Sequence, residues 1–131
     1  MIRSFVEKHI TAKKDVYATY LNGESQQILN KYPRESLIVG YKFIRDTTIT
    51  KVDYNDFDLE IFKNEKHPTD RFVKKFKEYY GQLITNRGVM FEKLGNKKEA
   101  LRYYNLAIPF FKYNPEMQDI VNQLLMKLQN K

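Results

Sequence analysis

Residues 84–107, which read ITNRGVMFEKLGNKKEALRYYNLA, predict two antiparallel helices joined by a short turn. Gly95 marks the turn, because glycine adopts at little steric cost the left-handed conformation that ends many helices. Gly88 in the first helix and Ala100 and Ala107 in the second are small. We therefore expect the two backbones to approach closely where these three residues face each other.

The spacing within residues 81–115 resembles that of the tetratricopeptide repeat, a family of paired antiparallel helices. The matching positions carry large, small and aromatic residues in the family's order, and they are Ile84, Gly88, Phe91, Gly95, Ala100, Tyr104 and Ala107. We expect the two aromatic residues to fill the space around the close approach. The sequence departs from the family at Arg87, where leucine is preferred, and at Lys112, where a proline usually closes the repeat.

Capping signals place the helices around this stretch. Apolar residues at three- and four-residue steps predict that the first helix begins soon after Pro68; they are Phe72, Val73, Phe76, Tyr80, Leu83, Ile84, Phe91 and Leu94. Asn96, with a glutamate three residues later, is typical of the start of the second helix. Pro109 removes an amide donor, so we expect the last turns of that helix to loosen.

A third helix is expected after Asn114 and Pro115, since asparagine caps helices and proline suits their first position. Its apolar stripe comprises Met117, Ile120, Val121, Leu124, Leu125 and Leu128. We expect it to cap the helical hairpin. No later repeat follows in this sequence to cover its other side, so a homo-oligomer formed through this helix is an open alternative.

The N-terminal half gives weaker signals. Apolar residues between Phe5 and Tyr32 recur at helical spacing and predict a helical hairpin broken near Gly23. Residues 36–62 fit two structures: a helix over 35–44 or a strand hairpin turning near residues 45–46. We favour the helix, because proline and glutamate at positions 33 and 35 suit a first turn.

Length and composition indicate one domain over residues 1–131, with an N-terminal region 1–67 and a helical region 68–131. The expected fold class is mainly α, a helical-hairpin array with a C-terminal capping helix. The alternative is α+β, with a short strand hairpin in 37–54. The 19 aromatic residues, 10 Tyr and 9 Phe, exclude an intrinsically disordered chain.

The sequence has no cysteine, which excludes thiol catalysis and thiolate metal sites. No apolar run approaches the ~20 residues that span a bilayer, and charged residues stand where a signal peptide has its apolar stretch. We expect a protein without a transmembrane segment; its location is not determined by the sequence, and the cytoplasm is favoured.

The residues with catalytic or metal-binding chemistry are scattered. His9 and His67 are the two histidines, and no serine elbow or phosphate-binding loop accompanies them. Four acids (Asp53, Asp56, Asp58 and Glu60) lack the spacing and central glycine of a calcium loop. They fit a solvated loop or a contact with basic residues of the following helix. We expect no enzyme activity, no cofactor and no metal.

The net charge of +7 is unevenly distributed, since residues 46–70 hold seven acids and three bases and residues 71–131 hold five acids and twelve bases. A basic surface attracts acidic proteins, nucleic acids or anionic lipids. Aromatic residues beside bases, as in Lys75-Phe76-Lys77, Arg102-Tyr103-Tyr104 and Phe111-Lys112-Tyr113, could stack on single-stranded nucleic acid. At helical spacing such residues more often belong to a core.

The resemblance to tetratricopeptide repeats implies a protein–protein interaction module, whose first helix lines a concave surface that binds a peptide or a partner helix. Carried onto this sequence, the partner-binding candidates are Lys75, Gln82, Thr85, Asn86, Arg87, Val89 and Lys93. The three basic residues favour an acidic partner, and the asparagine amide can both donate and accept hydrogen bonds. Two alternatives are a helical nucleic-acid-binding module and an accessory domain of a larger enzyme or membrane assembly.

Overall fold

The computed structural model describes residues 8–9, 16–18, 34–37, 40–43 and 71–131. The chain divides into two compact units, Met1–Lys51 and Val52–Lys131. Three quarters of the described residues are helical, and the rest include a small antiparallel sheet. This composition fits the α+β alternative better than a fold of helices alone. The grouping of the whole chain into one domain stays a prediction.

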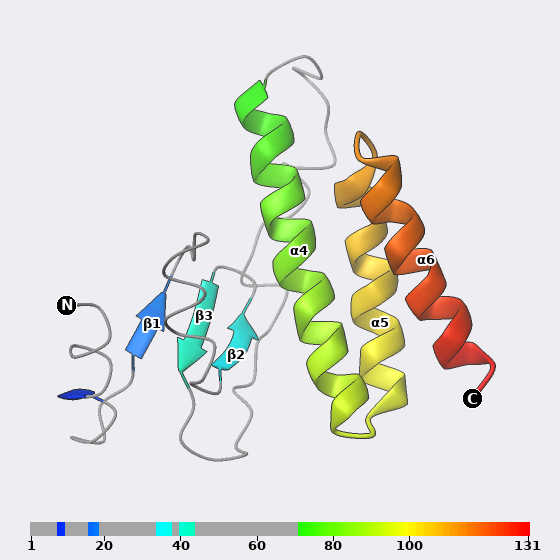
Figure 1. The fold of residues 1–131 in the computed structure, drawn as a ribbon, viewed down its shortest axis with the longest axis horizontal. Coiled ribbons are helices and arrows are strands. Elements are labelled where there is room, and N and C mark those ends of the chain that lie inside the picture. Colours follow the sequence, from blue (N-terminus) through cyan, green and yellow to red (C-terminus); the bar gives the residue numbers. More distant parts are fainter. Residues whose placement is uncertain (1–7, 10–15, 19–33, 38–39, 44–70) are drawn as a thin grey trace. The chain divides into compact units, whose positions relative to one another are not determined.

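The first unit contains a three-stranded antiparallel sheet of order β1-β3-β2 (Figure 1). Its strands are β1 (Val16–Ala18), β2 (Arg34–Leu37) and β3 (Gly40–Phe43). Val16 lies directly opposite Phe43, and both side chains are buried. Apolar pairs of this kind across neighbouring strands stabilise a sheet, and β-branched and aromatic residues suit such positions.

Two predictions for this unit are wrong. The helix expected over 35–44 is replaced by β2 and β3, which pair in register from Arg34↔Phe43 to Leu37↔Gly40. The helical hairpin expected from residue 5 to residue 32 is wrong at β1, and most of its other residues lie outside the described part. β1 depends on pairing with β3, which lies far along the chain and which local periodicity does not report. β2 and β3 are near neighbours in the chain and pair with each other.

The strand hairpin also differs in place from the alternative over 37–54. It is formed by residues 34–43, and the chain reverses between Leu37 and Gly40 rather than near residues 45–46. Residues 44–54 lie outside the described part. Lys42 stands opposite Tyr17 in the neighbouring strand, with its Nζ 5.9 Å from the ring centroid.

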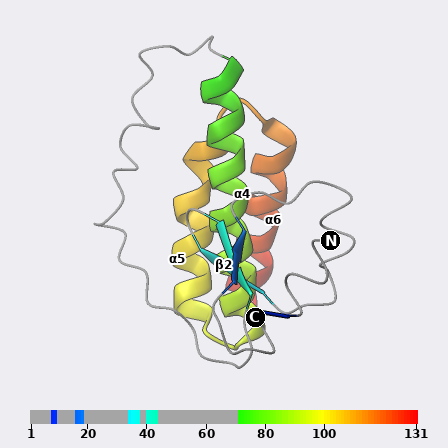
Figure 2. The same cartoon turned by 90° about the vertical axis from the view of Figure 1, so that its left-hand side faces the viewer.

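The second unit contains three helices and a short 3-10 segment: α4 (Arg71–Lys93), α5 (Lys97–Ala107), η2 (Ile108–Phe111) and α6 (Pro115–Gln129). Figures 1 and 2 show α4 and α5 side by side and antiparallel, with α6 running beside α5. The core lies among these elements and comprises Ile84, Ala100, Tyr103, Tyr104, Ala107, Phe110, Phe111, Val121, Leu125 and Leu128. The three helices and their order are as predicted.

The predicted helix ends are confirmed. Asn96 Oδ1 accepts a hydrogen bond from the Glu99 amide, and Asn114 Oδ1 accepts one from the Met117 amide, both at 3.1 Å. Gly95, at φ 76°, ends α4 in the left-handed conformation. The chain after Ala107 tightens into η2, with Pro109 inside it, as its missing amide donor predicts.

The close approach of α4 and α5 centres on Gly88. A Cβ atom there would lie 2.7 Å from Cδ1 and Cε1 of Tyr104 and 3.2 Å from Cβ of Tyr103. The nearest neighbour is thus the Tyr104 ring rather than the two predicted alanines, although Ala100 and Ala107 are fully buried in the same core. One residue without a side chain therefore makes room for a large ring.

Two of the predicted apolar stripes contain residues that the structure leaves exposed. Phe72 and Phe76 of α4, Leu94 just after it and Ile120 of α6 are exposed, although their spacing predicts core positions. Phe72 and Phe76 lie in the first two turns of α4, and Leu94 follows its last residue. Helical spacing therefore identifies a face, but the length over which that face is covered depends on the packed partner.

Replacing Gly88 with leucine should lower the free energy of unfolding by about 1–3 kcal/mol, because the new side chain overpacks the Tyr104 ring. Urea denaturation monitored by circular dichroism measures this change. Gln82→Leu, at an exposed position of the same helix, should change stability by no more than about 0.5 kcal/mol. Equal effects of the two substitutions would contradict the helix contact.

Candidate functional site

Four of the predicted partner-binding residues form an exposed line along α4. Lys75, Gln82, Asn86 and Lys93 are all exposed. At 100° per residue, the steps of seven, four and seven residues keep the four within about 20° of one line, and the 18-residue interval spans about 27 Å. We call these four residues the polar line. It lies opposite Ile84, which is packed in the core.

The polar line carries one lysine near each end and two amides between them. Lysine offers three donors on a flexible stem, and the amides offer both donors and acceptors. The line therefore provides positive charge at two separated points and hydrogen-bonding groups in the interval. This arrangement can bind a chain segment lengthwise.

The other three candidates are not exposed. Thr85 is buried, and its Oγ1 donates to the carbonyl oxygen of Gly81 one turn earlier, at 2.8 Å. Val89 is half-buried and packs against the core of the helices. Arg87 has only 2% of its surface exposed. The expectation that Thr85 is exposed is therefore wrong, and a partner-binding role of the three residues stays a prediction.

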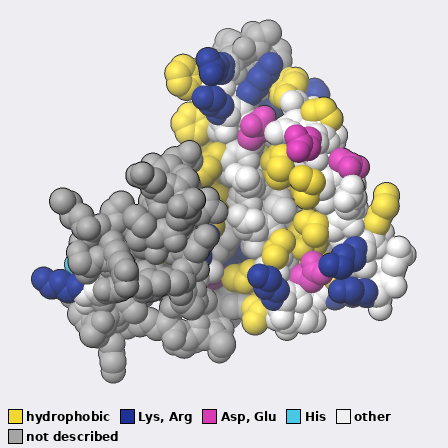
Figure 3. All heavy atoms as spheres, viewed as in Figure 1, with side chains coloured by type: hydrophobic (Ala, Val, Ile, Leu, Met, Phe, Trp, Pro, Cys, Tyr) yellow, Lys and Arg dark blue, Asp and Glu magenta, His cyan; other side chains and the backbone are white. Residues whose placement is uncertain are grey.

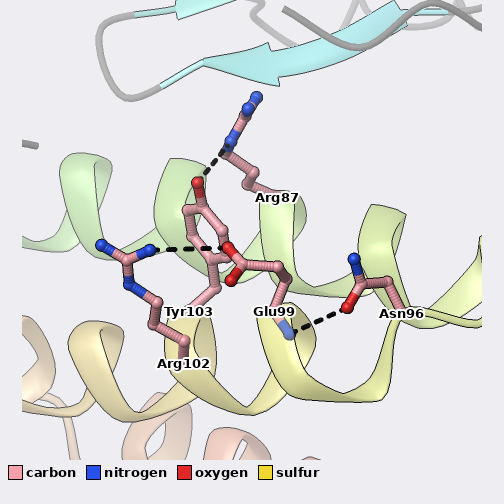
Figure 4. Close-up of polar contacts among 5 residues, drawn as sticks. All are labelled: Arg87, Asn96, Glu99, Arg102 and Tyr103. Carbon is pink, nitrogen blue, oxygen red and sulfur yellow. Dashed lines mark hydrogen bonds and ion pairs between the residues drawn. The ribbon is translucent and has the colours of Figure 1, made fainter. Parts of the chain in front are cut away.

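Arg87 is held by aromatic side chains of α4 and α5. Its Nε donates to Oη of Tyr103 at 2.8 Å (Figure 4), and its guanidinium lies 5.4 Å from the ring centroids of both Tyr103 and Phe91. The two rings stack at 5.3 Å. Arg87, which stands where the repeat family prefers leucine, thus contacts two aromatic rings and a tyrosine hydroxyl.

Tyr104, beside Tyr103 on α5, is fully buried against Gly88 and donates its Oη proton to Oε2 of Glu92 at 2.7 Å. Burial, together with the hydrogen bond to Glu92 and the charge of that carboxylate, raises the pKa of Tyr104 well above its usual value. The other Glu92 oxygen lies 4.0 Å from Nζ of Lys131. The sequence did not predict that Tyr104 and Lys131 both contact Glu92 of α4, because only the fold brings these residues together.

A second cluster lies where α4 begins and η2 meets α6. The amino groups of Lys74, Lys77 and Lys112 lie 4.9, 5.7 and 5.5 Å from the ring centroid of Tyr113. The sequence pattern that points to this cluster is the placement of basic residues beside aromatic ones. Of the three such segments, Arg102-Tyr103-Tyr104 is ruled out as a stacking surface, because both of its rings are buried.

The described residues contain no group of three or more His, Asp or Glu side chains that could hold a metal ion. His9 lies in the described part, whereas His67 and the four acids of residues 53–60 do not. Within the same residues no helix is long and apolar enough to cross a membrane. Comparisons with models of protein families, with curated proteins and with solved structures found no match to this chain.

Tyr103→Phe should lower the free energy of unfolding by about 1.5–3 kcal/mol, because it removes the acceptor of a buried, charged donor. Denaturant titration measures the loss. Tyr17→Phe removes a hydroxyl from an exposed tyrosine and should stay within about 0.5 kcal/mol of the wild type. A neutral Tyr103→Phe would show that Arg87 gains nothing from this bond.

Loss of the Tyr104 proton at alkaline pH should lower the free energy of unfolding. Its raised pKa means that the folded chain holds the Tyr104 proton more tightly than the unfolded chain does. The contribution of this proton to the free energy of unfolding is therefore constant below the ordinary tyrosine pKa of about 10 and is lost as the pH rises above it. The stability difference between the wild type and Tyr104→Phe should shrink by up to about 1.4 kcal/mol per pH unit above pH ~10. Denaturant titrations of both proteins across that range measure it, and parallel curves would contradict the assignment.

Proposed function

We propose that this chain is a non-catalytic protein–protein interaction module that binds a peptide or partner helix along the polar line of α4. The observation that carries the proposal is the alignment of Lys75, Gln82, Asn86 and Lys93 on one exposed face. The opposite face of α4 is packed against α5 and η2. A helix held rigidly on one side presents the other in a fixed geometry, which reduces the entropy lost on binding.

The resemblance to tetratricopeptide repeats supports the same surface. In that family the first helix of each hairpin lines the binding surface, and α4 is the first helix of the α4–α5 pair. Gly88, Phe91, Gly95, Ala100, Tyr104 and Ala107 are the residues that carry the resemblance. The family assignment is part of the proposal, since the described residues contain one helical hairpin and one further helix.

The spacing of charges along the polar line suggests the form of the partner. An extended segment advances about 3.3 Å per residue, so two acids about eight residues apart would meet Lys75 and Lys93 together. The backbone between them would run past Gln82 and Asn86, whose amides can pair with its N–H and C=O groups. A helical partner would need about eighteen residues to place its acids at the same distance.

Acidic peptides are the direct test of this function. Labelled peptides with two glutamates eight positions apart should bind the full chain, and versions with the glutamates adjacent or replaced by lysine should bind more weakly. Lys75→Glu with Lys93→Glu should weaken binding by about tenfold, since two exposed attractive pairs become repulsive. Fluorescence anisotropy measures the affinity, and NMR shift changes along α4 locate the peptide.

Arg102→Glu with Lys127→Glu is the matched control, because it makes the same charge change at exposed positions of α5 and α6, away from the α4–α5 turn that follows Lys93. It should leave the affinity within about twofold at moderate salt, where charges beyond a Debye length are screened. Equal losses from both double variants, or shift changes confined to α6, would refute the polar line as the binding site. Tight binding of an oligonucleotide with a steep salt dependence would favour the nucleic-acid alternative.

A further inference from the structure

The first two turns of α4 carry an exposed patch that the polar line does not explain. Phe72 and Phe76 have 74% and 54% of their surface exposed, and Arg71 and Lys75 beside them are exposed as well. At 100° per residue these four side chains occupy one arc of about 140° around the helix. We call them the Phe–Lys patch. Figure 3 shows hydrophobic and basic side chains gathered over this end of α4.

The surroundings of the Phe–Lys patch are strongly basic. Residues 71–77 hold four bases and no acid; Arg71 and Lys75 are exposed, Lys74 is half-buried and Lys77 is buried. Lys74 and Lys77 lie over the ring of Tyr113, where Lys112 joins them. The exposed bases Arg71 and Lys75 therefore stand beside two exposed phenylalanine rings. A partner for this surface must be anionic and must also accept apolar side chains.

We propose that the Phe–Lys patch docks onto a bilayer surface that contains anionic lipids. Phenylalanine inserts at the boundary between headgroups and acyl chains, and lysine and arginine beside it attract anionic headgroups. Their long stems lie along apolar surface while the charges stay in water. The charge of the bilayer complements the bases, and its fluid interior complements the rings.

Two other occupants fit the observations less well. A second copy of this chain meeting the patch face to face would bring the exposed Arg71 and Lys75 of both copies together, which like-charge repulsion opposes. Single-stranded nucleic acid would stack on aromatic faces, but three lysine amino groups already lie over the Tyr113 ring. Stacking on Phe72 and Phe76 needs no polar group on the ring, so the oligonucleotide measurement below distinguishes this occupant from lipid.

This proposal is independent of the polar line. The two phenylalanines lie about 60–100° around α4 from that line, although Lys75 belongs to both surfaces. Variants at Phe72 and Phe76 therefore report on the lipid proposal, and peptide binding by those variants reports on the proposed function. The two proposals can fail separately.

The absence of tryptophan from the chain makes a direct test available. Phe72→Trp introduces a single reporter in the full-length protein. With vesicles of phosphatidylcholine and phosphatidylserine, its emission should shift to the blue and be quenched by brominated acyl chains. Met126→Trp, at an exposed apolar position of α6, should show neither change. With phosphatidylcholine alone, both reporters should behave as in buffer.

Vesicle co-sedimentation supplies the second measurement. Phe72→Ser with Phe76→Ser should weaken binding to the anionic vesicles by more than about tenfold, because two apolar side chains no longer insert. Arg71→Glu with Lys75→Glu should weaken it by about thirtyfold, which corresponds to about 1 kcal/mol for each base removed. Lys97→Glu with Lys98→Glu, at the opposite end of the α4–α5 hairpin, should change it by less than about threefold.

Circular dichroism should show unchanged folding for all these variants, since every substituted side chain is exposed. The proposal is overturned if the wild-type chain does not sediment with anionic vesicles, or if the serine double variant binds as tightly as the wild type. An unshifted Phe72→Trp emission on bound protein would also overturn it. Preferential binding of a single-stranded oligonucleotide, lost in the same serine variant, would assign the patch to nucleic acid.

Discussion

The close approach of α4 and α5 at Gly88 is the constraint on which the rest of the second unit depends. The Tyr104 ring occupies the space that a side chain at residue 88 would take, and its hydroxyl reaches Glu92 one turn further along α4. On the neighbouring position of α5, Tyr103 reaches Arg87. Two adjacent tyrosines thus fasten one helix to the other, and the rotation of α4 about its axis is determined by that attachment.

The orientation of α4 determines which of its residues can meet a partner. With Ile84 and Gly88 directed into the core, Lys75, Gln82, Asn86 and Lys93 are left on the outer face. The same orientation leaves Phe72 and Phe76 exposed in the first two turns. One helix therefore presents two chemically distinct surfaces, a polar one along its length and an aromatic, basic one at its start.

The candidate site was partly predictable from the sequence. Helical period alone identifies the outer face, where four of the seven candidates are exposed. It does not report that Thr85 and Arg87 are buried and Val89 half-buried, because the exposure of a helix residue depends on what packs beside it. Arg87 is an instructive case, since a charged residue is rarely buried unless it is paired. Tyr103, which accepts a hydrogen bond from the Arg87 Nε, lies sixteen residues away, on another helix.

What the sequence by itself determined is the set of helices in residues 71–129 and their ends, because caps, glycine turns and proline positions act through atoms a few residues apart. Only the tertiary structure decided that residues 16–18, 34–37 and 40–43 form a sheet, since Val16 and Phe43 stabilise it from positions 27 residues apart. It also decided which ring fills the space at Gly88 and which cation is buried. The physical reason is the same in each case: local hydrogen bonds are specified by neighbours in the chain, whereas burial is specified by whatever the folded chain brings alongside.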